Sequence, residues 1–276
     1  MAIVTFWSEC KKEIGQTTTA IAVATQMAIE HNYKILLIST CNESELEKAF
    51  WDIEKNKKGL MSLFDNSKRV NIDSGIQGLA KVKLSNKLMP ENITNYSKIV
   101  LKDRLEILDG YDGNEAGYEN LLKVYPEIIA KASLYYDIVM VDLNRKIANL
   151  NINEIIQNSD VIVYGLNQKL KTINNFLESP IQNKNNVISY VGRYDKFSKY
   201  NIKNISRYLK NRREISFLSY NTLLNDACEE GTVADLFFKL KQIKSEDKNL
   251  DLLEESRKIS ESIIYKIQEL ELKIWF

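Results

Sequence analysis

The sequence predicts an α/β protein in which parallel strands are joined by helices. Its first segment contains an apolar run over residues 2–7, a polar turn, an alanine-rich run over residues 20–29 and a second apolar run over residues 34–38. This order of strand, loop, helix and strand is typical of two parallel strands linked by a crossover helix. Further apolar runs, at residues 135–144, 159–166, 187–191 and 215–219, indicate additional buried strands.

The loop between the first strand and the first helix is the strongest candidate for a ligand site. Backbone N–H groups at a helix N-terminus attract anions, so a loop in this position faces a ligand. A phosphate-binding loop also needs glycines for close backbone approach, a lysine that reaches the β- and γ-phosphates, and a Ser or Thr hydroxyl on Mg²⁺. Residues 10–18, with the sequence CKKEIGQTT, supply part of this set.

This loop resembles the deviant Walker A motif, K-G-G-x-G-K-T-T, of the ParA/MinD partition-type ATPases, which are P-loop proteins. The family's first lysine corresponds to Lys11, its last glycine to Gly15, and its two hydroxyl residues to Thr17 and Thr18. The Walker lysine is replaced by Gln16. The resemblance implies that these five residues contact nucleotide, with ATP and Mg²⁺ as cofactors and Thr17 as a metal ligand.

The departures from the family motif weaken the site for ATP. Lys12 and Glu13 stand where the family has two glycines, and Glu13 would bring negative charge toward a polyphosphate. Gln16 can donate hydrogen bonds but cannot neutralise charge. A hydrogen bond to a charged group contributes roughly 1.5–3 kcal/mol, so loss of the ammonium is expected to weaken binding by about one to two decades. Hydrolysis is expected to be weak or absent.

An acidic residue lies near the end of the apolar run YYDIVMVDLN at residues 135–144. In open α/β sheets, ligands bind at the carboxyl ends of the strands. The run resembles the Walker B or switch II strand of the same family, which implies that Asp142 contacts Mg²⁺ through water. We also hypothesise that Arg145 or Lys146 supplies the charge lost at Gln16.

Two later strand ends resemble the family's base-binding segments. Gly192 and Arg193 follow the strand at residues 187–191, where the family has an Asn-containing segment. Asn221 follows the strand at residues 215–219 and corresponds to the Asn of the family's P-x-N segment, with Ser219 in place of its proline. The resemblance implies that Arg193 and Asn221 bind nucleotide. The matches together span roughly residues 2–240 and imply a doubly wound, mostly parallel sheet with helices on both faces.

The middle of the chain gives weaker patterns. Residues 59–104 are interpreted as helical segments and loops, residues 104–108 as a strand, and residues 118–133 as one helix. The acidic, glycine-containing stretch DGYDGNEAG between the last two has no calcium-loop spacing and is interpreted as a solvated turn.

Composition indicates a soluble chain in a reducing compartment. The 276 residues are 44% hydrophobic, carry a net charge of +1 and include three widely spaced cysteines without metal-ligand spacing. No apolar run approaches the ~18–20 residues of a membrane span. We therefore expect a cytoplasmic protein with a P-loop ATPase-like domain over residues 1–245 and a C-terminal helical extension over residues 246–276.

A basic stripe is predicted along one helix. Lys196, Lys199, Lys203, Arg207 and Lys210 recur at three- and four-residue spacing, and Arg212 and Arg213 follow. Such a stripe can neutralise the phosphates of DNA. A solvated helix face is the alternative, and it is favoured because the charge of the whole chain is balanced.

The C-terminal segment has the spacing of an amphipathic helix, with Ile259, Ile263, Ile267, Leu270 and Ile274 on one face. MinD-type proteins carry a membrane-targeting helix at this place. Acidic residues reduce the positive charge of the polar face, which binding to anionic lipids requires. Packing on the domain or on a second subunit is therefore favoured over a membrane role.

The expected function is that of a degenerate ParA/MinD-like protein acting as a cytoplasmic scaffold or localisation factor. The chain is similar to the TadZ-like localisation ATPases of type IV (Flp/Tad) pilus systems, in which the P-loop is often degenerate, so a pilus or secretion component is an expected partner. The family also implies a homodimer across the nucleotide face. The alternatives are a slow ATPase with Lys11 and Asp142 active, and a DNA-binding partition protein that uses Lys199, Lys203 and Arg207.

Overall fold

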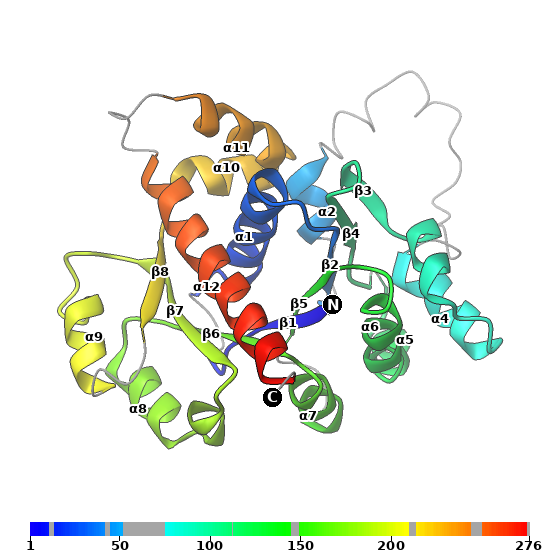
Figure 1. Cartoon of the computed structure of the whole chain (residues 1–276), viewed down its shortest axis with the longest axis horizontal. Helices are drawn as coiled ribbons and strands as arrows, with labels where there is room; N and C mark the ends of the chain where they lie inside the picture. The colour runs from blue at the N-terminus through cyan, green and yellow to red at the C-terminus, as the bar shows by residue number, and fades with distance from the viewer. Residues whose placement is uncertain are drawn as a thin grey trace.

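The computed structural model describes residues 1–10, 14–41, 45–51, 75–111, 113–144, 149–209, 214–243 and 250–274. An eight-stranded sheet runs through the molecule in the order β3-β4-β2-β5-β1-β6-β7-β8 (Figure 1). All neighbouring strands are parallel except β3 and β4, which pair antiparallel. The predicted α/β class and mostly parallel sheet are confirmed. The strands are β1 (Ala2–Trp7), β2 (Ile35–Ser39), β3 (Lys98–Leu101), β4 (Leu105–Leu108), β5 (Ile138–Asp142), β6 (Val161–Leu166), β7 (Val187–Tyr194) and β8 (Ile215–Ser219).

Helices cover both faces of the sheet (Figure 1). One face is covered by α1, α2, α10, α11 and α12, and the other by α4 to α8, with α9 near the β8 edge. The helices are α1 (Gln16–Glu30), α2 (Glu45–Phe50), α4 (Gly75–Leu84), α5 (Glu115–Leu122), α6 (Tyr125–Ala132), α7 (Asn149–Gln157), α8 (Leu170–Glu178), α9 (Ile202–Tyr208), α10 (Thr222–Glu230), α11 (Val233–Gln242) and α12 (Leu250–Ile274), with 3-10 turns at Pro90–Asn95 and Pro180–Asn183.

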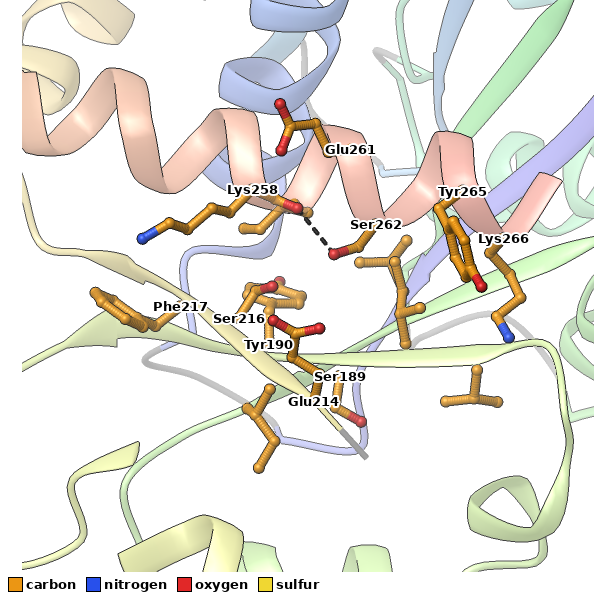
Figure 2. Close-up of a pocket in the computed structure, with 15 residues that line it drawn as sticks. Ser189, Tyr190, Glu214, Ser216, Phe217, Lys258, Glu261, Ser262, Tyr265 and Lys266 are labelled. Carbon is orange, nitrogen blue, oxygen red and sulfur yellow. Dashed lines mark hydrogen bonds between the residues drawn. The ribbon is translucent and has the colours of Figure 1, made fainter. Parts of the chain in front are cut away.

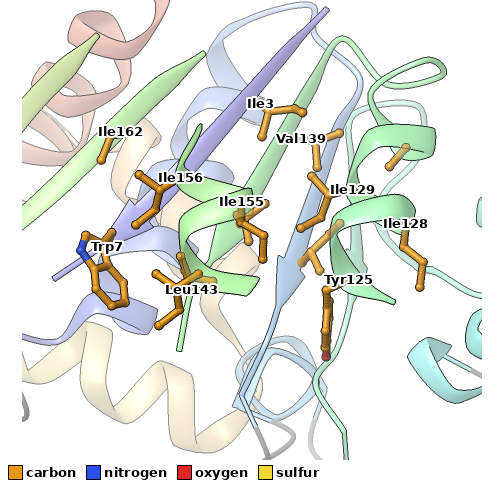
Figure 3. Close-up of a cluster of buried hydrophobic side chains, with 14 of the residues drawn as sticks. Ile3, Trp7, Tyr125, Ile128, Ile129, Val139, Leu143, Ile155, Ile156 and Ile162 are labelled. Atoms are coloured by element: carbon orange, nitrogen blue, oxygen red, sulfur yellow. The ribbon is translucent and has the colours of Figure 1, made fainter. Parts of the chain in front are cut away.

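Strand β1 is buried on both faces because both are covered by helices. Ile3 and Trp7 belong to the core cluster beneath α5, α6 and α7, which Figure 3 shows. Val4 and Phe6, at the alternate positions, belong to the cluster beneath α1 and α12. A strand that is buried on both faces has apolar residues at successive positions, which explains why it was predicted from the sequence.

Two predictions for the middle of the chain were wrong. Residues 98–101, placed in a stretch of helices and loops, form β3, a short edge strand that turns back onto β4. The helix expected over residues 118–133 is divided into α5 and α6, with the break at Lys123 and Val124. Pro126 lies in the first turn of α6, where its missing N–H is tolerated, so it begins a new helix rather than continuing the old one.

The prediction of one long basic helix was also wrong. Helix α9 covers only Ile202–Tyr208 and therefore carries Lys203 and Arg207, whereas Lys196 and Lys199 lie in the turn that precedes it. Asn201 begins the helix by accepting a hydrogen bond from the backbone N–H of Asn204, as an N-cap residue does. Lys210, Arg212 and Arg213 lie outside the described residues.

The C-terminal helix α12 packs along α1 and across β8 (Figure 1). Its buried residues include Leu252, Ile259 and Ile263, which share the core cluster of α1. Arg257 of α12 also forms an ion pair with Glu30 at the end of α1, where Nε donates to Oε2 at 2.8 Å. Among the described residues, the apolar face of this helix is therefore buried within the chain from Leu252 to Ile264 and partly buried at Ile267 and Leu270. The division of the chain at residue 245 stays a prediction.

None of the described helices combines the length and hydrophobicity that crossing a membrane requires.

Candidate functional site

The loop after β1 lies at the carboxyl edge of the sheet, at its topological switch point. Strand β1 lies between β5 and β6, and the crossovers from β1 to β2 and from β5 to β6 run in opposite directions along the sheet. Ligands of open α/β sheets bind at such a point. Phe6 pairs in register with Asp142, so the loop that follows β1 meets the acid that ends β5.

Three predicted site residues form one hydrogen-bonded group. Thr17 Oγ1 donates to Asp142 Oδ2 at 2.6 Å, and Gln16 Nε2 donates to Asp142 Oδ1 at 2.7 Å. Gln16 Nε2 also donates to the backbone carbonyl oxygen of Leu143 at 3.1 Å. Asp142 is 1% exposed, so its carboxylate is satisfied inside the protein by these two neighbours.

The bonding of Gln16 limits what this residue can offer a phosphate. A primary amide nitrogen carries two hydrogens, and the two acceptors around Gln16 Nε2 use both of them. The remaining polar atom, Oε1, accepts hydrogen bonds and would repel a phosphate oxygen. Donation from Gln16 to a phosphate therefore requires the loss of a hydrogen bond, either to the buried carboxylate or to the Leu143 carbonyl.

Burial raises the pKa of Asp142 above its ordinary value, because the charged form is removed from water. The hydrogen bonds from Thr17 and Gln16 act in the opposite direction by stabilising the charged form. No cation among the described residues contributes to this pKa. A lysine in place of Gln16 would have supplied the missing counter-charge.

The side chains present suit the Mg²⁺ ion of the expected cofactor but not its triphosphate. A hydroxyl and a carboxylate are hard oxygen donors that suit Mg²⁺, so Thr17 and Asp142 fit the metal. Gln16 does not fit the triphosphate, since its donors are used and it has no charge. Among the described residues, no group of three or more His, Cys, Asp or Glu side chains is placed to hold a metal ion.

The backbone of the loop packs directly on β7, a contact that the sequence analysis missed. A Cβ atom added to Gly192 would lie 2.0 Å from the carbonyl oxygen of Ile14. Gly15, at the start of α1, has a φ of 62°, a left-handed conformation that favours glycine. Gly192 therefore serves close backbone approach, where the sequence analysis saw only the absence of the family's asparagine. Its position after an apolar strand was the available clue.

Arg193 lies across the loop at the same strand end. It has a φ of 47°, and β7 shifts register against β8 between Gly192 and Tyr194. Its Nε lies 3.4 Å from the position of a Cβ on Gly15, and its guanidinium carbon lies 5.9 Å from the centre of the Tyr220 ring. The space left here is about 20 Å³, lined among others by Gly15, Thr18, Arg193, Tyr220 and Asn221.

Four predicted nucleotide-binding residues, Gly15, Thr18, Arg193 and Asn221, are thus brought together around this small cavity. The side chain of Asn221 caps α10 by accepting a hydrogen bond from the backbone N–H of Leu224 at 3.0 Å. Their roles toward a nucleotide stay predictions. Lys11, together with the substitute cations Arg145 and Lys146, lies outside the described residues.

A carboxylate from α12 reaches the end of β8, and no sequence pattern indicated it. Glu255 accepts hydrogen bonds from the Ser219 backbone N–H at 2.7 Å and from Ser219 Oγ at 2.8 Å. Burial raises the pKa of Glu255, while the bonds from Ser219 oppose that rise. This contact fixes the strand end that precedes Asn221.

The end of β2 carries two hydroxyl groups, those of Ser39 and Thr40. Thr40 Oγ1 donates to the backbone carbonyl of Asp142 at 3.1 Å and accepts from the backbone N–H of Asn144 at 2.7 Å. The hydroxyl of Tyr118 donates to the Thr40 carbonyl at 2.5 Å. These bonds join the ends of β2 and β5 without a charged group.

A separate cavity of about 600 Å³ lies beneath the middle of α12, over the first residues of β7 and β8 (Figure 2). Tyr190, Ser216 and Glu214 line its floor, and Lys258 and Glu261 line its roof. It is formed at the amino ends of the strands, away from the loop after β1. Because it lies at the opposite edge of the sheet, it is not part of the candidate site.

The fold of this chain matches that of several solved structures. No protein-family model and no curated protein matches this chain. A ParA family ATPase from Chlorobium tepidum matches with a TM-score of 0.66 and 12% identity over 96% of this chain and 98% of that chain. The septum site-determining protein MinD from Pyrococcus horikoshii, complexed with Mg-ADP, matches with a TM-score of 0.65 and 13% identity over 96% and 98%.

A putative plasmid partition protein from Borrelia burgdorferi, bound to AMPPNP, matches with a TM-score of 0.60 and 17% identity, over 97% of this chain and 98% of that chain. These matches cover nearly the whole of each chain. The chain therefore has the fold of the ParA and MinD ATPases.

Proposed function

We propose that this chain is a degenerate ParA/MinD-like protein that acts as a scaffold or localisation factor, with ATP hydrolysis weak or absent. The observation that carries the proposal is the bonding of Gln16, whose two amide hydrogens are given to Asp142 and to the Leu143 carbonyl. The residue at the position of the Walker lysine stabilises the protein's own carboxylate instead of offering charge to a phosphate.

The missing charge at Gln16 favours weak or absent ATP binding and disfavours efficient phosphoryl transfer. Phosphoryl transfer depends on positioning and on cations that stabilise the charge developing on the transferred group. Gln16 brings no cation, and Asp142 has none near it among the described residues. Loss of one charge-assisted hydrogen bond alone corresponds to roughly 1.5–3 kcal/mol.

The base side of the site gives independent support. Arg193 and Tyr220 reduce the space beside Gly15 and Thr18 to about 20 Å³, far less than the roughly 300–1,000 Å³ of pockets that enclose small ligands. A nucleotide would have to displace the Arg193 side chain. The protein's own side chains therefore fill most of this region, which suits a scaffold.

The partner and assembly follow from the resemblance of the sequence. We propose that the chain forms a homodimer across the face that carries Gly15 and Asp142, and that it positions a component of a type IV (Flp/Tad) pilus or secretion system in the cytoplasm. A structure of the MinC:MinD cell division protein complex from Aquifex aeolicus, which matches with a TM-score of 0.59, supports partner binding as a role for this fold.

Calorimetric titration with ATP and Mg²⁺, combined with a phosphate-release assay, tests the proposal. We expect weak or absent binding, no turnover, and a molar mass by light scattering that does not change with ATP. Tight binding together with steady phosphate release would reject the scaffold role. The comparison requires the Gln16→Lys variant as a positive reference, since it restores the family residue.

A slow ATPase with a nucleotide-dependent dimer cycle is the second candidate. It is favoured by the contact between Thr17 and Asp142, because this pair preserves the oxygen donors that would hold Mg²⁺. In this case phosphate release depends on Mg²⁺, Asp142→Ala abolishes it, and ATP increases the dimer fraction. Turnover that survives Asp142→Ala would come from a contaminant and would exclude the candidate.

A further inference from the structure

The turn before α9 and the helix itself concentrate positive charge in a chain that is nearly neutral. Residues 195–208 contain four Lys or Arg and one Asp, whereas the whole chain has a net charge of +1. Lys196, Lys199, Lys203 and Arg207 are exposed. In the described part of the chain, none of these four is in an ion pair. Their charge is available to a polyanion.

Aromatic rings alternate with these cations. Phe197 is 86% exposed and Tyr208 is 44% exposed, so much of each ring is free to contact a partner. Lys196 Nζ lies 5.3 Å from the centre of the Phe197 ring, and Lys199 Nζ lies 5.9 Å from that of Tyr200. A surface that only needed to be solvated would not require exposed rings between its charges.

A hollow of about 400 Å³ lies between the turn and α9. Its lining consists of Lys199, Tyr200, Asn204, Arg207 and Tyr208. The ring centres of Tyr200 and Tyr208 are 6.2 Å apart with an angle of 51° between the planes, so the two rings form adjoining walls. A flat, unsaturated group can lie on one wall while an attached anion reaches a cation at the rim.

The turn is held in place from below, which makes the surface preformed. Gln168 Nε2 donates to the carbonyl oxygens of Asp195 and Tyr200 at 2.8 and 2.9 Å, and Gln168 Oε1 accepts from the Asp195 N–H at 2.7 Å. Asn204 Nδ2 donates to the Lys199 carbonyl at 2.7 Å. A preformed site loses less conformational entropy when it binds.

We propose that this α9 patch, formed by Lys196, Phe197, Lys199, Tyr200, Arg207 and Tyr208, binds single-stranded nucleic acid. Unpaired bases stack on exposed aromatic rings, and cations beside the rings neutralise the phosphates that connect the bases. A DNA duplex keeps its base faces inside the helix, and an acidic peptide offers no ring faces in sequence. Only a single strand uses both features of the patch.

Fluorescence anisotropy with the full-length chain at low salt tests this proposal. The probes are a short oligothymidine, an oligouridine of equal length and a duplex of equal length. We expect the single strands to bind more tightly than the duplex. Comparison of the affinities for oligothymidine and oligouridine then shows whether DNA or RNA is the preferred ligand. Absence of single-strand binding at low salt overturns the proposal.

Two sets of variants separate stacking from charge. Phe197→Ala and Tyr208→Ala are each expected to weaken single-strand binding by about fivefold or more, since a lost base stack costs roughly 1–3 kcal/mol. The double variant Lys199→Ala/Arg207→Ala should reduce the slope of log K against log salt by about 1.4, as expected for two lost phosphate contacts. Ring variants that leave affinity unchanged, with equal or tighter duplex binding, would assign the patch to duplex DNA.

Matched controls lie on other helices. Tyr265→Ala removes a ring that is 68% exposed on α12, and Lys239→Ala/Lys241→Ala removes two exposed cations from α11. Neither should change affinity or salt slope by more than the experimental error. A loss of binding in these controls equal to that of the patch variants would show unspecific adsorption and reject the α9 patch.

Discussion

The residue that most determines the chemistry of this molecule is Gln16. Its amide nitrogen contacts the carboxylate of Asp142, which is separated from it by 126 positions in the sequence. The carboxylate is buried, accepts from Thr17 as well, and lacks a cation among the described residues. Gln16 therefore satisfies this acid without bringing a positive charge to the loop after β1.

Gln16→Lys is expected to strengthen the binding of Mg-ATP by about ten- to a hundredfold, because an ammonium adds a charge-assisted hydrogen bond to the phosphates. Calorimetric titration measures the change. Gln242→Lys, at an exposed position on α11, introduces the same charge away from the site and should leave affinity unchanged. An unchanged affinity in Gln16→Lys would mean that the loop cannot accept a triphosphate for another reason.

Asp142→Asn is expected to stabilise the fold at neutral pH. A raised native pKa means that the carboxylate destabilises the native state above that pKa, while below the unfolded value of about 3.8 the acid is neutral in both states. The contribution of Asp142 to the free energy of unfolding thus falls as the pH rises from the pKa of the unfolded state to that of the native state. Asparagine keeps an acceptor for Gln16 and can donate to the Thr17 hydroxyl.

Thermal unfolding of wild type and Asp142→Asn across this pH range checks the expectation. The advantage of the variant should be present at pH 7 and disappear in acid. A variant that is less stable than wild type at pH 7 would mean that a cation from outside the described residues stabilises the ionised carboxylate of Asp142.

At the scale of elements, the contact between α12 and β8 links the C-terminal helix to the candidate site. Glu255 satisfies both the backbone N–H and the hydroxyl of Ser219, immediately before the segment that contains Asn221. The packing of α12 on α1 places this carboxylate, so the helix acts as a structural part of the sheet edge rather than as an independent extension.

Glu255→Ala is expected to lower the free energy of unfolding by about 1–3 kcal/mol, since it leaves the half-buried Ser219 N–H without this acceptor. Glu255→Gln keeps an acceptor and should remain within about 1 kcal/mol of wild type. Urea denaturation provides the measurement. Glu254→Ala, an exposed neighbour on the same helix, is the control and should change stability by no more than about 0.5 kcal/mol. Equal effects at both positions would contradict the proposed contact.

At the scale of the whole molecule, the packing of α12 bears on the choice between scaffold and membrane protein. Ile259 and Ile263 are buried against the cluster of α1 and cannot enter a bilayer unless the helix detaches. The ion pair between Arg257 and Glu30 also opposes detachment, and Arg257 holds the pKa of Glu30 below its ordinary value.

The full-length chain is therefore expected not to co-sediment with vesicles of anionic phospholipid. Co-sedimentation that is lost in Leu272→Glu, a substitution at an exposed position of α12, would show that this helix binds membranes in solution. Leu84→Glu, at an exposed position of α4, is the matched control for the change in charge.

Sequence patterns located the strands of the parallel core, the first helix and the loop between them, because burial on both faces and helical spacing are local properties of a chain. They missed the edge strand β3, since its four residues are exposed or half-buried and therefore give no continuous apolar run. They also merged α5 with α6 and extended α9, because helical spacing alone does not determine where a helix ends.

The sequence by itself determined the class of fold, the order of the parallel core strands and the presence of an uncharged Gln16 in the loop after β1; the correspondence of Gln16 to a Walker lysine stays a prediction. Only the tertiary structure decided the contacts, by placing Gln16 and Thr17 on Asp142, Glu255 on Ser219 and Arg193 over Gly15. Each of these contacts joins residues that lie far apart in the sequence. Their partners follow from the strand order of the sheet, which brings distant strand ends to one edge and which no local pattern encodes.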